Sequence, residues 1–393
     1  MTRTRVVLAV AIVAAVSVAA LSALQPRVAS EADSSPAGTV STPTRSPTSG
    51  AAATLEPPLQ PTPLVTPQPT PPQAVDPLTG RLVSPDDAGN PVVAVMIDDL
   101  APARPQSGFN AAGIVWQAPA EGGIPRYMLL FHATVPAAVG PVRSSREYFV
   151  EWAAEWRAMY AHAGGSPQAL QTLRTTGFGQ WVWNADEFRW GSSFWRVAFN
   201  TAPHNLFTDG EHLFALARRL GAAAPSAPTW RFAGDAPLQQ RPSGGSIQVV
   251  YPYESIVYRY DRETNTYARF IDGSKTPQAD AADDQAVAPT NVVVLAMAFG
   301  PLNDGEASKR RLEAQDVGHG VAWISTNGVT VNGTWRKTSV TAPTLLFGPD
   351  GSPAILTAGQ TFVQVMSLTD QVTVKPGRFS TPPAVRPPSL LPL

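Results

Sequence analysis

Apolar residues recur along this chain with two periods, one typical of strands and one typical of helices. Residues 92–97 and 292–297 are continuously apolar, as in strands that are buried on both faces of a sheet. Shorter runs predict further strands at residues 114–117, 127–132, 159–163, 256–260, 266–270, 322–325, 329–331 and 361–366. Strand signals therefore extend from residue 92 to residue 366.

One helix is predicted soon after residue 140. Ser144 followed by Glu147 has the spacing of a capping box, which predicts a helix start with Arg143 at its mouth. An apolar stripe that would face the core recurs at helical spacing and comprises Tyr148, Trp152, Trp156 and Met159. The strand predicted at 159–163 means that this helix ends before it.

Two further helices have recognisable caps. The first is predicted over residues 167–174, with Ser166 as its N-cap and a proline at the first helical position. The second is predicted over residues 210–220, with Asp209 before it and Gly221 after it. All three predicted helices lie in the first part of the folded region.

Turn signals dominate the second part. Residues 262–265 connect two predicted strands as a hairpin, and Asn327-Gly328 lies between two more. Asn332-Gly333 and Asp350-Gly351 are further turn signals. The order of elements predicts an α+β fold, with a mixed sheet and helices in the N-terminal part followed by a part rich in β-hairpins.

The ends of the chain differ from this folded region. Two arginines and an apolar run occupy residues 1–24, which is typical of a signal peptide or of a signal anchor that stays in the membrane. Residues 25–75 are dominated by Pro, Ser, Thr and Ala and predict a disordered linker. The predicted parts are the signal at 1–24, the linker at 25–75, an α/β domain at 76–222, a connection at 223–245, a β-rich domain at 246–374 and a proline-rich tail at 375–393.

Composition excludes several classes of function. The 393 residues carry a formal net charge of −1 without a basic run in the folded region, so nucleic acid is not an expected partner. The absence of cysteine excludes disulfides, thiolate metal sites and a lipidated cysteine. Neither the P-loop pattern nor the G-x-S-x-G motif of hydrolases occurs. We expect no cofactor.

Residues 140–168 carry the strongest sign of a binding site. A predicted strand, the turn Gly164-Gly165-Ser166 and a helix start follow one another there, and such a turn binds anions readily. An ordinary strand-to-helix connection has the same pattern. The aromatic residues of 181–195 could form the floor of a sugar site, but the core is the expected place for them.

Six sequence blocks in the N-terminal part resemble one known family. They are VAVMIDD at 93–99, ARPQSGF at 103–109, APAEGGIPRYM at 118–128, GPVRSSR at 140–146, HAGGSPQAL at 162–170 and APHNLFTD at 202–209. The resemblance is to the YerB-like bacterial envelope lipoproteins, a domain of unknown function with a distinct C-terminal region. It continues through NVVVL at 291–295, VNGTWRK at 331–337 and GQTFVQV at 359–365. It implies an extracytoplasmic α+β protein, here anchored by the N-terminal segment because no cysteine is present.

Polar residues in these blocks are the candidate site. The ligand-binding candidates are Asp98, Arg126, Arg143, Ser144, Arg146, Gly164, Gly165, Ser166 and Asn205. The candidates for acid-base catalysis are Glu121, His162 and His204. If the strands that end near Asp98 and His162 are neighbours, these groups meet at one sheet edge. They could equally form an internal ion-pair network, and no metal site is expected because the histidines lack ligand spacing.

Two classes of function follow from these candidates. The first is an extracytoplasmic protein, anchored to the membrane or secreted, that binds an anionic cell-wall polymer or an envelope protein. The second is an envelope hydrolase or transferase that uses Glu121 with His162 or His204 as acid and base.

Overall fold

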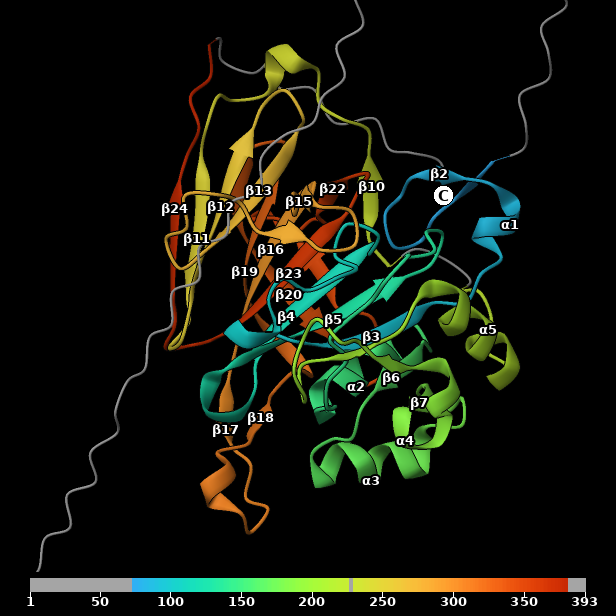
Figure 1. The fold of residues 1–393 in the computed structure, drawn as a ribbon. Helices are drawn as coiled ribbons and strands as arrows, with labels where there is room; N and C mark the ends of the chain where they lie inside the picture. The colour runs from blue at the N-terminus through green and yellow to red at the C-terminus, as the bar shows by residue number, and fades with distance from the viewer. Residues whose placement is uncertain (1–72, 226–228, 381–393) are drawn as a thin grey trace, which may run out of the picture. The chain divides into compact units, whose positions relative to one another are not determined.

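A ten-stranded mixed sheet is the central element of the protein (Figure 1). The computed structural model describes residues 73–225 and 229–380. The sheet has the strand order β21-β20-β19-β16-β23-β4-β5-β3-β6-β7. The strands are β3 (Val93–Asp98), β4 (Ile114–Pro119), β5 (Pro125–Phe131), β6 (Met159–His162), β7 (Trp183–Asp186), β16 (Asn291–Met297), β19 (Gly318–Thr326), β20 (Val329–Lys337), β21 (Leu345–Phe347) and β23 (Thr361–Ser367). The α+β prediction is confirmed.

Both faces of the central strands of this sheet, such as β3, β4 and β16, are buried, which explains the continuous apolar runs in the sequence. Along β3, Val95 and Ile97 point into one core, whereas Ala94 and Met96 point into the other. Successive side chains of a strand point to opposite faces, so each strand supplies residues to both cores.

A four-stranded antiparallel sheet contributes to one of these cores. Its strands are β11 (Ser246–Val250), β12 (Ser255–Asp261), β13 (Thr266–Ile271) and β24 (Gln371–Lys375). Ile247 and Tyr258 from this sheet lie in the same core as Val95 and Phe362 from the central sheet. The hairpin of β12 and β13 was predicted, but β24 was not, since the strand region was expected to close near residue 366.

The helices α2 to α5 gather around the β6 and β7 end of the central sheet, whereas α1 lies beside β2 (Figure 1). The helices are α1 (Pro85–Ala88), α2 (Glu147–Ala154), α3 (Pro167–Thr176), α4 (Glu187–Trp190) and α5 (Gly210–Leu220). Trp152 of α2 is fully buried and stacks on Trp116 of β4 with ring centroids 4.7 Å apart. Trp156 is also buried, so the prediction that both tryptophans face the core is confirmed. α5 packs into the opposite core through Leu213 and Phe214.

The predicted caps of two helices are confirmed. The Ser166 hydroxyl accepts a hydrogen bond from the Ala169 N–H at the start of α3. The Asp209 carboxylate caps α5 by accepting from the His212 N–H. Gly221 ends α5 in the left-handed conformation, with φ 91°.

Two sequence predictions are wrong. Arg146, not Ser144, is the N-cap of α2, because Ser145 bonds to the Gly164 carbonyl and its chain stays extended. Asn332-Gly333 is not a turn but lies inside β20. A Cβ at Gly333 would come within 2.0 Å of the Phe347 carbonyl oxygen, so the glycine allows β21 to approach β20.

Short elements complete the fold. The two-stranded pairs are β1 (Ala74–Val75) with β2 (Leu82–Val83), β8 (Trp195–Arg196) with β9 (Leu206–Phe207), β10 (Arg231–Ala233) with β22 (Ile355–Thr357), β14 (Ala279–Asp280) with β15 (Gln285–Ala286), and β17 (Phe299–Pro301) with β18 (Leu312–Ala314). The 3-10 helices are η1 (Ala101–Ala103), η2 (Glu121–Gly123), η3 (Gly191–Ser193), η4 (Leu238–Gln240) and η5 (Ala307–Lys309). The predicted signal at 1–24 and nearly all of the predicted linker lie outside the described residues.

The strand β23 joins the two halves of the sequence. It pairs in parallel with β16 on one side and with β4 on the other. A single sheet therefore runs through both the N-terminal and the C-terminal sequence regions. No helix in residues 73–225 and 229–380 is long and apolar enough to cross a membrane.

Candidate functional site

The candidate site lies where three parallel strands of the central sheet end. β3 pairs with β6, and β6 pairs with β7, with all three parallel. The expectation that the strands ending at Asp98 and His162 are neighbours is therefore confirmed. Between their ends runs the segment 142–145, in which the Arg143 N–H donates to the Met96 carbonyl and the Arg143 carbonyl accepts from the Ala163 N–H. Arg143 is thus placed at the edge where open sheets usually bind ligands.

Asp98 is the centre of this arrangement. One carboxylate oxygen, Oδ2, lies 2.6 Å from Nδ1 of His204 and 2.9 Å from Nε of Arg143. The other, Oδ1, accepts a hydrogen bond of 3.1 Å from the Leu100 N–H. The Asp98 side chain is only 3% exposed, while those of Arg143 and His204 are 21% and 13% exposed. We call Asp98, Arg143 and His204 the Asp98 site.

The Asp98 site has side-chain nitrogens without partners. Among the described residues, neither terminal nitrogen of Arg143 nor Nε2 of His204 makes a hydrogen bond to the protein. Asp98 fixes one end of each side chain, through an ion pair with Arg143 and a hydrogen bond with Nδ1 of His204. The unpartnered nitrogens are available to a ligand that enters from solvent.

Glu121 occupies a second group of charges, which we call the Glu121 cluster. Its carboxylate forms ion pairs with Arg126, at 3.0 Å, and with Arg146. Burial lowers the pKa of Arg126 and lowers that of Arg146 to about 10. Both oxygens of Glu121 are held by guanidinium groups, which argues against its predicted role as a free general base.

A hydrogen bond and a strand pairing connect the Asp98 site to the Glu121 cluster. Arg126 donates through Nη1 to the Ser144 carbonyl at 2.7 Å. Asp98 and Arg126 are direct partners across β3 and β5. The two groups together contain three guanidinium groups, of Arg126, Arg143 and Arg146, and two carboxylates, of Asp98 and Glu121. Their sum is one net positive charge. The predicted gathering of arginines is present, and part of it is an internal ion-pair network.

The glycine turn contributes less than the sequence predicts. The Gly164 carbonyl accepts from the Ser145 N–H, and the Ser166 N–H donates to the Ser145 carbonyl at 3.1 Å. The Ser166 N–H is therefore already used and does not point toward a ligand. Gly164 has φ 67°, a conformation that favours glycine. Gly164 and Gly165 lie at the sheet edge beside the segment that carries Arg143.

Two predicted site residues are engaged elsewhere. His162 is fully buried, with Nδ1 2.8 Å from the Gly164 carbonyl and Nε2 2.8 Å from the Asn184 side-chain oxygen. Neither ring nitrogen is free, so His162 is a poor candidate for proton transfer. Asn205 stays within the β8–β9 hairpin, where its side-chain oxygen accepts from Arg196 at 2.8 Å. It has no hydrogen bond to the candidate arginines.

A buried polar network on the other side of Asp98 was not predicted. Gln117 donates through Nε2 to both the Asp99 and the Glu254 carboxylates, and Arg104 forms ion pairs with the same two groups. Arg269 donates to the Gln117 oxygen at 2.7 Å. Burial and the nearby Glu254 carboxylate raise the pKa of Asp99.

Arg104 also lies 3.6 Å from the exposed Asp272 carboxylate, so three carboxylates face the two guanidinium groups of this network. Gln117 is the polar residue in an otherwise apolar strand, and that was its only signal in the sequence. Glu254 and Arg269 lie far away along the chain, so nothing local pointed to them.

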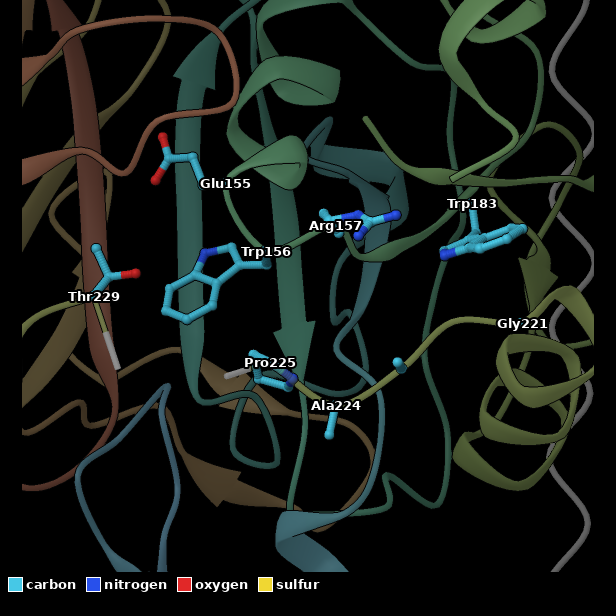
Figure 2. Close-up of a pocket in the computed structure, with 9 residues that line it drawn as sticks. Glu155, Trp156, Arg157, Trp183, Gly221, Ala224, Pro225 and Thr229 are labelled. Atoms are coloured by element: carbon cyan, nitrogen blue, oxygen red, sulfur yellow. The ribbon is translucent and has the colours of Figure 1, made fainter. Parts of the chain in front are cut away.

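A separate cavity of about 470 Å³ lies between α2, β7 and the segment after α5 (Figure 2). Trp156, Arg157 and Trp183 line it, and none of the candidate site residues does. Its polar groups already have partners: Glu155 pairs with Lys337, and Arg157 donates to the Gly179 carbonyl. We therefore place the candidate site at Asp98 and not in this cavity.

Within the described ranges, no group of three or more His, Asp or Glu side chains is arranged to hold a metal ion.

Two family models match the chain. The model of the N-terminal domain of a protein of unknown function (DUF3048) matches residues 78–223, and the model of the C-terminal domain of the same family matches residues 247–363. The chain is 28% identical over 309 residues to a Bacillus subtilis (strain 168) protein named "Putative lipoprotein YerB", covering 77% of this chain and 88% of that protein. A crystal structure of YerB from Bacillus subtilis superposes with a TM-score of 0.66 at 25% identity, covering 76% of this chain and 99% of the other.

Proposed function

Since the chain belongs to this YerB-like family of unknown function, we propose that it is a membrane-tethered protein of the cell envelope that binds an anionic wall polymer at the Asp98 site. The lipoprotein name of its Bacillus relative supports the envelope placement. In this chain the apolar run within residues 1–24 would replace the lipid anchor, because no cysteine is present. The linker at 25–75 would then hold the folded part away from the membrane.

The observation that carries the proposal is the set of side-chain nitrogens without hydrogen-bond partners around Asp98. Arg143 presents two terminal nitrogens and His204 presents Nε2 at one sheet edge, and both side chains are held by the same carboxylate. A guanidinium fork matches the geometry of a carboxylate or a phosphate. The neighbouring Glu121 cluster leaves one positive charge uncompensated, which favours a negatively charged ligand.

Titration of the full chain with inorganic polyphosphate tests this proposal. We expect Arg143→Gln to weaken binding by about 10- to 100-fold, the range of one charge-assisted hydrogen bond. Arg174→Gln, at an exposed position near the end of α3, is the matched control and should leave the affinity unchanged. Equal effects of the two substitutions would show that only general surface charge matters, and the proposal would then be wrong.

A second candidate function is acid-base catalysis in the envelope, and the geometry of His204 favours it. Asp98 holds Nδ1 of His204 and leaves Nε2 free, the arrangement in which a histidine accepts a proton from water or from a hydroxyl group. This assigns the acid-base role to His204 with Asp98 instead of to Glu121. A pH-rate profile on cell-wall fragments separates the two functions: an enzyme shows titrating limbs that His204→Gln abolishes, whereas a binding protein shows no turnover.

A further inference from the structure

Exposed aromatic side chains are concentrated in one stretch of the chain. Phenylalanine is usually buried, yet Phe188 is 80% exposed and Phe199 is 75% exposed. In the described ranges, four of the six exposed aromatic residues lie between positions 178 and 199. The sequence alone favoured the core for this aromatic region, and the structure shows that part of it faces solvent.

Phe188 lies on one side of Arg143. The turn at Gly164 bonds to the segment that carries Arg143, and a Cβ built on Gly164 would lie 3.5 Å from Cε2 of Phe188. The order across the sheet edge is therefore Arg143, Gly164 and Phe188. Adjacent strands lie about 4.8 Å apart, so the backbone segments that carry Arg143 and Phe188 are roughly 10 Å apart. Gly164 has no side chain to fill the space between them.

Phe199 lies on the His204 side of the same site. It belongs to the loop between β8 and β9, which also carries His204, and the His204 N–H donates to the Thr201 carbonyl within that loop. The Phe199 ring packs on the ring of Phe207, with centroids 5.5 Å apart, and this contact holds it in place. The position of Phe188 thus follows from its contact with Gly164, and the position of Phe199 follows from the loop that it shares with His204.

Polar residues surround both rings. Asp186 and Glu187 precede Phe188, and Asn200 and Thr201 follow Phe199. The rings therefore do not form a continuous apolar patch of the kind that covers a protein interface. Isolated rings among hydrogen-bonding groups suit the apolar faces and hydroxyl groups of sugar rings.

We infer that the anionic ligand of the Asp98 site is a glycan, whose acidic group binds Arg143 while its sugar rings pack on Phe188 and Phe199. This inference rests on the proposed function and adds the chemical class of the ligand. A polymer without sugar rings would use the arginine but not the phenylalanines.

Titrations of the full chain with three probes test the inference. The probes are an oligogalacturonate, a polyphosphate with the same number of charges, and a neutral dextran. We expect the oligogalacturonate to bind about tenfold more tightly than the polyphosphate, because hot-spot aromatic contacts have this magnitude. Phe188→Ala and Phe199→Ala should each weaken oligogalacturonate binding about tenfold and leave polyphosphate binding unchanged, whereas Arg143→Gln should weaken both.

Phe178→Ala is the matched control. Phe178 is 59% exposed but bridges to Trp183 at the start of β7, at the opposite end of that strand from Asp186. If Phe188→Ala and Phe199→Ala behave like Phe178→Ala, the glycan inference is wrong while the anion site stands. If no anionic probe binds, the proposed function itself fails. Binding to anionic lipid vesicles that is lost in Phe188→Ala, without glycan binding, would assign the rings to a membrane and overturn the inference.

Discussion

Nε of Arg143 lies 2.9 Å from Oδ2 of Asp98, which links the segment before α2 to the end of β3 by charge. Breaking a buried ion pair is costly when a buried charge loses its only partner. Asp98 would still accept hydrogen bonds from His204 and from the Leu100 N–H after Arg143 is replaced. We therefore expect Arg143→Gln to lower the free energy of unfolding by only about 1 kcal/mol.

Asp98→Asn provides the contrast to Arg143→Gln. It removes the negative charge shared by Arg143 and His204, so we expect a loss of about 2–4 kcal/mol. Urea denaturation of both variants measures the difference. A loss of several kcal/mol in Arg143→Gln would show that the arginine is a structural partner, contrary to the proposed binding role.

Trp152→Ala should destabilise the protein by about 3–5 kcal/mol, because the side chain is fully buried and stacks on Trp116. Thermal denaturation measures the change. Trp195→Ala, at an exposed position, is the control and should cost about 1 kcal/mol or less. An unchanged melting temperature in Trp152→Ala would contradict the packing of α2.

Lys337 and Glu155 form a buried ion pair with an N–O distance of 2.7 Å, and both side chains are almost inaccessible. Lys337→Met leaves the Glu155 carboxylate without its cation, so we expect a loss of about 3–5 kcal/mol. Adding Glu155→Gln should recover part of this loss, because the charge is removed as well. A double-mutant cycle measures the coupling, and additive effects would show that the pair is not coupled.

Glu151 contributes a pH dependence to stability. Burial, followed by a hydrogen bond to Asp316, raises the pKa of Glu151 to about 9, so the folded protein keeps this proton at neutral pH. Between the ordinary pKa of a glutamate and about 9, the unfolded chain loses the proton while the folded chain holds it. The free energy of unfolding therefore falls as the pH rises through this window.

Glu151→Gln keeps the side chain neutral in both states and should remove this dependence. We expect the variant to be more stable than the wild type by about 1–3 kcal/mol at pH 8, with little difference near pH 4. Urea denaturation at several pH values measures the curve, with Glu187→Gln at an intermediate surface position as control. A parallel pH dependence in Glu151→Gln and the wild type would assign the effect to other groups.

Residues 76 to 375 are expected to resist proteolysis as one body, whereas residues 25 to 75 are expected to be cut freely. The first range contains nearly all the strands of the fold, and the second is dominated by Pro, Ser, Thr and Ala. Limited proteolysis with mass spectrometry identifies the fragments. Stable fragments that begin before residue 60 would place the boundary elsewhere.

Local signals in the sequence predicted much of the fold. The caps at Ser166 and Asp209 and the hairpin at 262–265 depend on neighbouring residues, and the structure confirms all three. The capping box at Ser144 failed because a distant residue, Gly164, holds Ser145 extended. Asn332-Gly333 failed because its glycine serves strand packing and not a turn.

The site shows the same division between local and distant contacts. The sequence blocks identified Asp98, Arg143 and His204. They meet because the Arg143 N–H donates to the Met96 carbonyl of β3, and the neighbouring Val142 N–H donates to the Leu206 carbonyl at the end of the loop that carries His204. No pattern along the chain could show that Glu121 is held by two arginines or that both nitrogens of His162 are engaged. Hydrogen-bond partners are chosen in three dimensions, and only the structure reveals which polar groups remain free.

The position of β23 also bears on the order in which the sheet can be completed. This strand is among the last to leave the ribosome, yet it lies in the interior of the sheet between β16 and β4. Until residues 361–367 are synthesised, the N-terminal and C-terminal strands have no common neighbour and the sheet stays open. The buried centre of the sheet is therefore completed only when nearly the whole chain is available.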